Sequence, residues 1–236
     1  MILELDRLNV FIKTSHILHD VSLSVGEREV VCLIGRNGAG KTTTLKTIMG
    51  FLKPVSGSVK FRGRDITGLS THEIANMGIG FAPEESGIFP DLTVEENIEI
   101  ATWQRQSSHS PEERIALAYE VFPALTKYRN RKGTQMSGGE RKMLSVARAL
   151  ALDPHMLVLD EPFEGLSPAI IPAVSRGLAE ITQRGHAILL AESNIHHVPE
   201  FTTRLYVIER GEIIFAGRPD AVRGDAAVMR VIGGAA

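Results

Sequence analysis

The sequence predicts an α/β fold in which a parallel sheet is interrupted by a helical insertion. Residues 30–34 (VVCLI) form a continuous apolar, β-branched run, which is typical of a buried parallel strand. Two short apolar runs, at 156–159 and 187–190, have the same character and are separated by a helical segment. Between residue 84 and about 153, helix start signals replace strand signals, so this block is expected to be inserted into the sheet.

A glycine-rich loop follows the first buried strand. Residues 35–42 read GRNGAGKT, a complete G-x-x-x-x-G-K-T pattern, and residues 41–49 then read as a helix. Backbone N–H groups of such a loop cradle nucleotide phosphates, and the helix N-terminus adds its positive dipole. Glycine-rich turns also occur without nucleotide, but the complete pattern behind a buried strand favours binding. The predicted nucleotide-binding residues are Gly35, Arg36, Asn37, Gly38, Ala39, Gly40, Lys41, Thr42 and Thr43.

Within this loop two side chains have predicted roles of their own. Lys41 is expected to reach the β- and γ-phosphates, and the Thr42 hydroxyl is expected to bind Mg²⁺.

The remaining elements are predicted from local signals. Strands are expected at 2–5, 21–25, 58–61 and 79–82, and a hairpin around Arg210-Gly211. Helices are expected to begin at Ser70, Thr93, Ser110, Ser137 and Ser167. Ser70, Thr93 and Ser137 are each followed three residues later by glutamate, which is the capping-box pattern.

Composition and charge limit the classes of function. The chain has 236 residues, of which 43% are hydrophobic and 23% charged, as in ordinary globular proteins. We expect a single domain over 1–236, with a core of 1–83 and 156–236 and a helical subdomain at 84–155. A net charge of −2 predicts no nucleic-acid partner.

The single cysteine and the apolar runs bear on location. Cys32 excludes an intrachain disulfide and is expected to be buried. No apolar run approaches the roughly 20 residues that a membrane-spanning helix needs, and the start does not resemble a signal peptide. A cytosolic protein is expected, held at a membrane only through other proteins.

Two adjacent carboxylates follow the apolar run at 156–159. In parallel sheets, ligand sites lie at the carboxyl ends of the strands. Asp160 is therefore expected to hold Mg²⁺, usually through water, and Glu161 to polarise an attacking water. A solvated Asp-Glu pair at a strand end is common, and it is the glycine-rich loop elsewhere in the chain that favours the catalytic interpretation.

A second glycine pair opens the helix at Ser137. The segment Ser137-Gly138-Gly139-Glu140 is by itself an N-cap with a capping box. Two glycines in a first turn weaken a helix, so they indicate that the backbone must closely approach another molecule. We interpret the turn as a second anion site at a helix N-terminus.

Together, the loop at 35–42, the segment Met136–Glu140 and the strand ending in Asp160-Glu161 resemble the motifs of ATP-binding subunits of ABC transporters. The resemblance covers essentially the whole chain. It implies a P-loop NTPase (RecA-like) core with N-terminal antiparallel strands and an inserted helical subdomain, which binds ATP and Mg²⁺. It also implies a head-to-tail dimer of two ATPase subunits, in which Lys41 of one and Ser137, Gly138, Gly139 and Glu140 of the other enclose each ATP.

The same resemblance implies two membrane permease subunits as partners, at the cytoplasmic face of the inner membrane. A finer resemblance is to the second ATPase of branched-chain amino acid importers, a subgroup that includes relatives assigned to urea and short amides. It implies an indirect partnership with a periplasmic solute-binding protein. The segments that carry it are 42–45, 83–84, 88–97, 161–168, 191–194 and the hairpin at 206–217. The alternatives are an ATPase for export or lipid extraction, and a weakly hydrolysing ATP-binding subunit of a heterodimer.

Several positions depart from the family pattern. Glu84 stands where most relatives have a glutamine that binds water or the metal ion, and it is retained as a metal-site residue. Ser193 stands at the position of the family's γ-phosphate histidine, so we expect slow hydrolysis at this chain's own site. His196 and His197 are interpreted as ordinary histidines. The adenine-stacking aromatic aligns with Ile12, so either Phe11 beside it stacks on adenine through a local shift or Ile12 packs weakly on the base; Phe11 is favoured over plain core packing.

The segment 84–97 joins the predicted core to the helical block. It carries the apolar residues Ile88, Phe89 and Leu92 among acidic ones. Exposed apolar residues in a loop often mark a partner site, and the resemblance implies that this surface contacts a short helix of the membrane subunit. A loop in which Phe89 simply packs under its own chain is the alternative.

Overall fold

The computed structural model describes residues 1–233 and groups them into two compact units. The first unit contains Met1–Ile74 and the chain from Ala187 onward, and the second contains Ala75–His186. These boundaries differ from the division expected from the sequence, which is a core of 1–83 and 156–236 with a helical subdomain at 84–155. Residues 234–236 of that expected core lie outside the described residues. Strands at 79–82 and 156–160 group with the helical block because its longest helix packs against both of them.

The first unit holds the glycine-rich loop. Its elements are β1 (Leu3–Ile12), β2 (Ser15–Val25), β3 (Val30–Ile34), α1 (Lys41–Ile48), β4 (Ser56–Phe61), β5 (Arg64–Asp65), β8 (Ala187–Glu192), η3 (Ile195–His197), β9 (Arg204–Glu209), β10 (Glu212–Gly217), α7 (Pro219–Gly224) and α8 (Ala226–Ile232). The short helix α2 (Thr71–Asn76) lies at the unit boundary.

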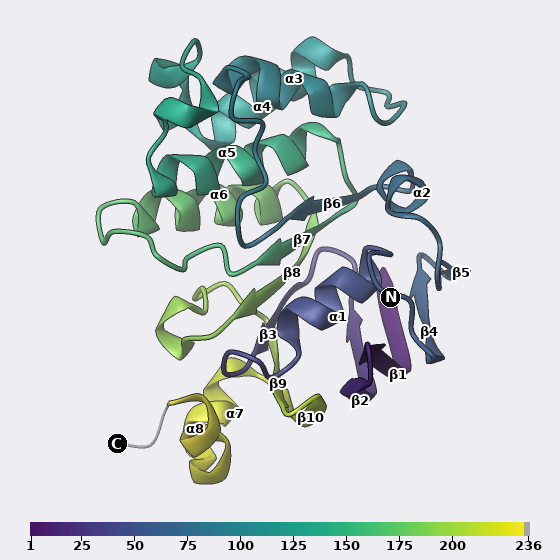
Figure 1. The fold of residues 1–236 in the computed structure, drawn as a ribbon. Coiled ribbons are helices and arrows are strands. Elements are labelled where there is room, and N and C mark those ends of the chain that lie inside the picture. The colour runs from purple at the N-terminus through teal and green to yellow at the C-terminus, as the bar shows by residue number, and fades with distance from the viewer. Residues whose placement is uncertain (234–236) are drawn as a thin grey trace. The chain divides into compact units, whose positions relative to one another are not determined.

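Two sets of strands flank α1 in this unit. One is an antiparallel sheet in the order β2-β1-β4-β5. In the other, β3 pairs in parallel with β8 and β9, and β10 closes a hairpin on β9. Helix α1 contacts β2 and β8, so it packs against both sets (Figure 1). All residues of β3 and β8 are buried, as their continuous apolar runs predicted.

Strands β1 and β2 are longer than the sequence predicted. Their pairing shifts register between Leu5 and Leu8, where Arg7 adopts a positive φ of 44° and its N–H bonds to the Ser22 hydroxyl. Such bulges break the alternation of apolar and polar residues. The alternating pattern therefore ends at the bulge although the strand continues to Ile12.

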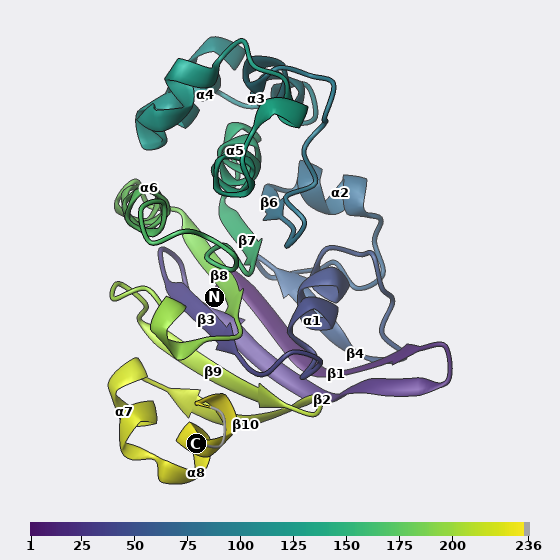
Figure 2. The same ribbon diagram turned by 60° about the vertical axis from the view of Figure 1, so that its left-hand side comes forward.

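The second unit is a helical layer on a two-stranded parallel ladder. Its elements are β6 (Ile79–Ala82), α3 (Val94–Thr102), α4 (Pro111–Val121), η1 (Pro123–Tyr128), η2 (Gly133–Gln135), α5 (Gly138–Ala151), β7 (Met156–Asp160) and α6 (Ile171–Gln183). Helix α5 contacts β6 and β7 and also α3 and α4, and Figure 2 views α5 and α6 almost end-on.

Helix starts in this unit follow the local signals closely, with one exception. Thr93, Ser110 and Ser137 are N-caps with complete capping boxes, each worth about 1 kcal/mol. The predicted start of α6 at Ser167-Pro168 is wrong. The helix begins at Ile171 instead. Ser167 begins a turn before the helix, in which its carbonyl accepts the Ile170 N–H at 2.9 Å.

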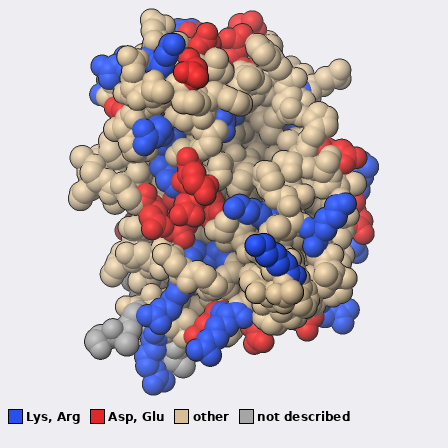
Figure 3. All heavy atoms as spheres, in the orientation of Figure 1, with Lys and Arg blue, Asp and Glu red and all other residues tan. Residues whose placement is uncertain are grey.

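The predicted α/β class with antiparallel N-terminal strands and a helical insertion is confirmed. Cys32 lies buried in β3, as expected. Within residues 1–233, the helices are all too short or too polar to cross a membrane. On the face drawn in Figure 3, basic and acidic side chains both occur and neither sign covers the face, in keeping with the net charge of −2.

Candidate functional site

The loop between β3 and α1 is held by close backbone contacts. The Gly35 N–H donates to the Glu192 carbonyl at 3.2 Å, and a Cβ at Gly35 would lie 2.3 Å from the Ile208 carbonyl oxygen. Only glycine fits there. Gly40 is the N-cap of α1 with a φ of 115°, a conformation that side chains other than glycine rarely adopt. The glycines of the motif therefore fix the path of the loop.

The two ends of this loop differ in exposure. Arg36, Asn37 and Gly38 are exposed, whereas Ala39 and Gly40 are buried. The Ala39 carbonyl accepts the Gly211 N–H at 2.8 Å, so the β9–β10 hairpin supports the buried end. An anchored loop with an open rim at a helix N-terminus fits a nucleotide phosphate chain.

Lys41 is the first residue of α1 and folds back over the loop. Its Nζ donates to the Gly35 carbonyl at 2.8 Å and to the Arg36 carbonyl at 3.3 Å, and the residue is 4% exposed. A phosphate bound at the loop would offer this ammonium group stronger, charged acceptors in place of the carbonyls. Thr42 and Thr43 follow on the same first turn and are half-buried.

A buried glutamate near Lys41 was not anticipated from the sequence. Glu192 ends β8 with no exposed surface, and its carboxylate lies 3.4 Å from Nδ1 of His197. Burial raises the pKa of Cys32, and the Glu192 charge raises it further against the opposing effect of Lys41. Every residue of β8 before Glu192 is apolar. A lone acidic residue at the end of such a buried strand is the sequence signal that could have identified Glu192.

Phe11 lies on the β1–β2 hairpin. Its ring stacks on His16 with centroids 4.2 Å apart, and His16 lies against His19 at 3.9 Å. Phe11 is 42% exposed and Ile12 41% exposed. The stacking of Phe11 on adenine stays a prediction.

In the second unit, Asp160 and Glu161 follow one another at the end of β7. They are 1% and 3% exposed. Glu161 has a positive φ of 49°, which is strained for a side-chain-bearing residue and typical of functional sites. Its carbonyl accepts the Lys142 Nζ at 2.7 Å and the Glu164 N–H at 3.3 Å, so α5 and the following turn hold the strained residue in place. Lys142 was missed by sequence reasoning.

The turn at Ser137 is exposed. Its capping box is formed by the Glu140 N–H donating to the Ser137 hydroxyl at 3.3 Å and the Ser137 N–H donating to the Glu140 carboxylate at 2.8 Å. Burial raises the pKa of Glu140, but hydrogen bonds from Tyr128 and Ser137 outweigh it and hold that pKa below its usual value. A negative charge thus caps α5.

The two glycines of this turn differ in surroundings. A Cβ at Gly138 would meet nothing within 4 Å, whereas a Cβ at Gly139 would lie 3.0 Å from Cγ2 of Ile170. Gly139 therefore has a packing reason within its own chain. Gly138 has none, which leaves its bare backbone available to another molecule.

The remaining candidates occupy loop positions. Glu84 is exposed just after β6, and Ser193 is half-buried just after β8. Arg36, Asn37 and Ser193 line one pocket, so the structure brings these three predicted residues together. Among the described residues, no three His, Cys, Asp or Glu side chains cluster as a metal cage.

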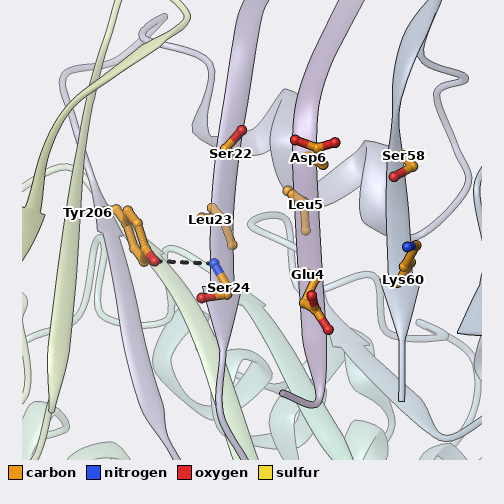
Figure 4. Close-up of a pocket in the computed structure, with 9 residues that line it drawn as sticks. All are labelled: Glu4, Leu5, Asp6, Ser22, Leu23, Ser24, Ser58, Lys60 and Tyr206. Carbon is orange, nitrogen blue, oxygen red and sulfur yellow. Dashed lines mark hydrogen bonds between the residues drawn. The ribbon is translucent and has the colours of Figure 1, made fainter. Parts of the chain in front are cut away.

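A second hollow lies on the outer face of the antiparallel sheet (Figure 4). It is a polar groove across β1, β2 and β4, bordered by Tyr206, whose hydroxyl accepts the Ser24 N–H at 3.2 Å. None of the predicted site residues lines it. It is therefore separate from the phosphate loop.

Comparison with known proteins places this geometry in context. Residues 18–164 match the family model described as ABC transporter. One relative is the lipopolysaccharide export system ATP-binding protein LptB of Haemophilus influenzae, 35% identical over 232 residues that cover 98% of this chain and 96% of that protein. Another is the high-affinity branched-chain amino acid transport ATP-binding protein BraG of Pseudomonas aeruginosa, 37% identical over 213 residues, covering 90% and 91%.

A solved structure is similar over nearly the same length. It is the dimeric structure of a post-hydrolysis state of the ATP-binding cassette MJ0796, bound to ADP and Pi. Its TM-score is 0.81 at 25% identity, and the match covers 92% of this chain and 98% of that one.

Proposed function

The chain belongs to the ABC transporter family as an ATP-binding subunit, and from that premise we propose that it hydrolyses ATP to drive import of branched-chain amino acids or a related small solute. The observation that supports hydrolysis most directly is Glu161, a buried carboxylate held at a positive φ directly after the buried Asp160. Strain retained at such a position is typical of residues selected for chemistry rather than stability.

Each proposed role follows from the chemistry of the group. The loop from Gly35 to Thr43 binds the phosphates through backbone N–H groups, and the Lys41 ammonium neutralises their charge. Glu161 accepts the proton of the attacking water. Thr42 and Asp160 would hold Mg²⁺, with Glu84 near the same ion, and the ion would supply further charge neutralisation at the phosphates.

The exposed turn at Ser137 supports a dimer in which a second ATPase chain contributes this turn to the nucleotide. The solved cassette similar to this chain is dimeric and bound to ADP and Pi. Gly138 leaves room for an approaching phosphate, and the N-terminus of α5 offers its dipole. The proposal includes both a homodimer and a heterodimer with a sister ATPase.

A preformed surface around Phe89 supports docking to a membrane permease subunit. Asn97 is fully buried, accepts the Phe89 N–H at 2.8 Å and donates to the Phe89 carbonyl at 3.0 Å. These bonds hold the backbone while the Phe89 ring remains 46% exposed. The Arg148 guanidinium lies over the ring, 5.3 Å from its centroid, within the range of a cation–π contact. A rigid exposed aromatic is a typical interface anchor.

Replacing Phe89 by alanine is expected to weaken permease binding about 30-fold or more, the usual effect of losing an aromatic anchor. ATP hydrolysis by the isolated chain should stay within about twofold, because the backbone is held by Asn97 and not by the ring. Co-purification with the permeases and ATPase assays would measure both. Trp103→Ala, at a residue that is 72% exposed, is the matched control; equal loss in both variants would contradict the proposed surface.

Charge reversal at Glu95 or Glu96 would be a poorer test of this surface than Phe89→Ala. Glu96 closes the capping box of α3 with Thr93, and Glu95 pairs with Arg129. Either reversal would disturb local structure. Phe89 has no such role.

The identity of the solute is the part of the proposal with the least direct support. Motif resemblance in segments 88–97 and 191–194 favours amino acid import, and a relative of that function is similar over 90% of the chain. Export of a lipid is the second candidate, because a relative from lipopolysaccharide export is similar over 98% of this chain. Reconstitution with permeases of each type, followed by solute uptake and lipid export assays, would separate the two.

Lys41→Ala tests the ATPase part of the proposal. We expect ATP affinity to fall about tenfold or more, because a charge-assisted bond to phosphate is lost. Calorimetric titration of the full chain with Mg-ATP would measure it. Lys46→Ala, one turn further along α1, is the control and should leave the ATP affinity unchanged. A wild-type chain that does not bind Mg-ATP would refute the proposed function.

A further inference from the structure

Glu161 adopts a backbone conformation that its own sequence disfavours. Its φ of 49° lies in the left-handed region, which is costly for any residue with a side chain. Pro162 follows it, and a residue before proline prefers an extended conformation because its backbone otherwise clashes with the proline ring. Two local preferences therefore oppose the observed conformation, and contacts from outside the segment 160–162 have to maintain it.

The backbone carbonyl of Glu161 accepts two hydrogen bonds. One comes from the Glu164 N–H at 3.3 Å, which is long for a backbone hydrogen bond. The other comes from the Lys142 Nζ at 2.7 Å, and it is shorter because the donor carries a positive charge. Lys142 therefore makes the stronger of these two contacts.

Fixing this carbonyl also fixes the direction of the Glu161 side chain. Strand β7 holds the chain up to Asp160, and the bonds from Lys142 and Glu164 hold the peptide unit that follows Glu161. With the peptide units on both sides held, φ and ψ of residue 161 are determined, because they are the only soft backbone torsions between these units. The direction in which the side chain leaves the backbone therefore depends on Lys142.

Lys142 is itself held in place by the helix that carries it. Helix α5 packs against β7 (Figure 2). Its N-cap is Ser137, and Lys142 lies about one and a half helical turns further on. Lys142 is half-buried, so water competes only partly for its ammonium group, and the bond to the carbonyl is stronger than it would be at the surface.

We propose that Lys142 is a positioning residue for ATP hydrolysis, whose ammonium group keeps Glu161 in the left-handed conformation that brings its carboxylate to the attacking water. This inference rests on the proposed ATPase function and on the role of Glu161 in it. Without the bond, residue 161 relaxes towards the extended conformation that Pro162 favours, and the carboxylate is displaced. A displacement of about 1 Å costs about 100-fold in rate at a catalytic group.

Lys142→Met tests the inference, because methionine is similar in length but has no donor. The kcat of Mg-ATP hydrolysis by the full chain should fall about tenfold or more. KM and the calorimetric ATP affinity should stay within about twofold, because the phosphate loop belongs to the other unit. Lys142→Arg should keep kcat within about threefold of wild type, because its guanidinium still donates to the carbonyl. Arg176→Met removes an exposed cation from α6 and is the control that should leave kcat unchanged.

Combining Lys142→Met with Glu161→Gln separates positioning from a general effect on structure. A residue that acts only through the Glu161 carboxylate loses its effect when that carboxylate is absent. The double variant should therefore hydrolyse ATP within about twofold of the rate of Glu161→Gln alone. A further fall in the double variant would overturn the inference, and so would a kcat loss in Lys142→Met that is matched by an equal loss of ATP affinity and a lower melting temperature.

The remaining outcomes distinguish this inference from the proposed function. Lys142→Met at the wild-type rate, beside a slow Glu161→Gln, would overturn the inference alone. Glu161→Gln at the wild-type rate would remove the role that Lys142 serves and thereby both. If Lys142→Met does not fold, Lys142→Arg decides: a wild-type kcat supports the donor role, and a loss of about tenfold with unchanged ATP affinity overturns it.

Discussion

Glutamine at position 161 is expected to slow ATP hydrolysis by about 100-fold or more while ATP affinity stays within about threefold of wild type. A positioned general base contributes about 10²- to 10⁴-fold to a rate, and an amide cannot accept the proton of the attacking water. Single-turnover hydrolysis of Mg-ATP by the full chain would measure the rate, and calorimetry the affinity.

The structure makes this substitution a specific probe of the carboxylate. Two contacts that hold residue 161 use its backbone carbonyl, which accepts from the Lys142 Nζ and the Glu164 N–H. Glutamine has the same shape as glutamate, so the positive φ of 49° carries the same strain in both. Folding should therefore be unaffected, and a lost rate reports on the chemistry.

Glu164→Gln is the matched control, because Glu164 lies three residues further along the same turn and is half-buried. Its hydrolysis rate should stay within about twofold of wild type. Glu161→Gln with a rate within about tenfold of wild type would remove Glu161 from the proposed mechanism. The weakly hydrolysing heterodimer subunit would then be the better description.

Much of the fold was predictable because its signals are local. Thr93 and Ser137 cap their helices through a glutamate three residues away, and this contact needs no tertiary structure. The buried strands β3 and β7 were recognisable because a parallel strand covered on both faces is apolar throughout. In each case the chain segment itself contains the whole pattern.

One prediction failed where a distant residue decides the local structure, and another failed where a turn replaces an expected helix cap. The strand β1 continues past a bulge because Arg7 is held by Ser22 from another strand. Helix α6 begins late because Ser167 forms a turn rather than a cap. Spacing along the chain contains neither fact.

The same limit applies to the candidate site. The pattern G-x-x-x-x-G-K-T specifies its own backbone, so the loop at 35–42 could be predicted with its helix. Lys142 holds Glu161 from 19 residues away, and Ile232 and Gly233 at the end of α8 line the same pocket as Arg36 of the loop. These relations arise only when the chain has folded.

The second large effect is expected at Gly138, where leucine should prevent ATP-dependent dimerisation without harming the fold. A Cβ at this position would meet nothing within 4 Å, so the chain itself has room for a side chain. Gly138 is the first residue of α5, and leucine is a better helix former than glycine by up to about 1 kcal/mol. The melting temperature should therefore stay the same or rise.

Dimer formation should respond in the opposite direction. In the proposed dimer the backbone at Gly138 faces a phosphate bound to the other chain, and a leucine side chain would occupy that space. A forced clash costs about 1–3 kcal/mol, and a symmetric dimer contains it twice, so dimerisation should weaken about 30-fold or more. Light scattering in the Glu161→Gln background with Mg-ATP would measure it, because slow hydrolysis preserves the ATP-bound state.

Two comparisons decide what a loss of dimer means. Glu112→Leu places leucine in the exposed first turn of α4 and should leave dimerisation unchanged, which excludes a general effect of added apolar surface. Gly139→Leu should lower the melting temperature, because its Cβ already lies 3.0 Å from Ile170. A Gly138→Leu chain that dimerises normally with ATP would mean that the open space beside this turn is not filled by a partner's nucleotide, and the shared-site model would fail even if Glu161 proves essential.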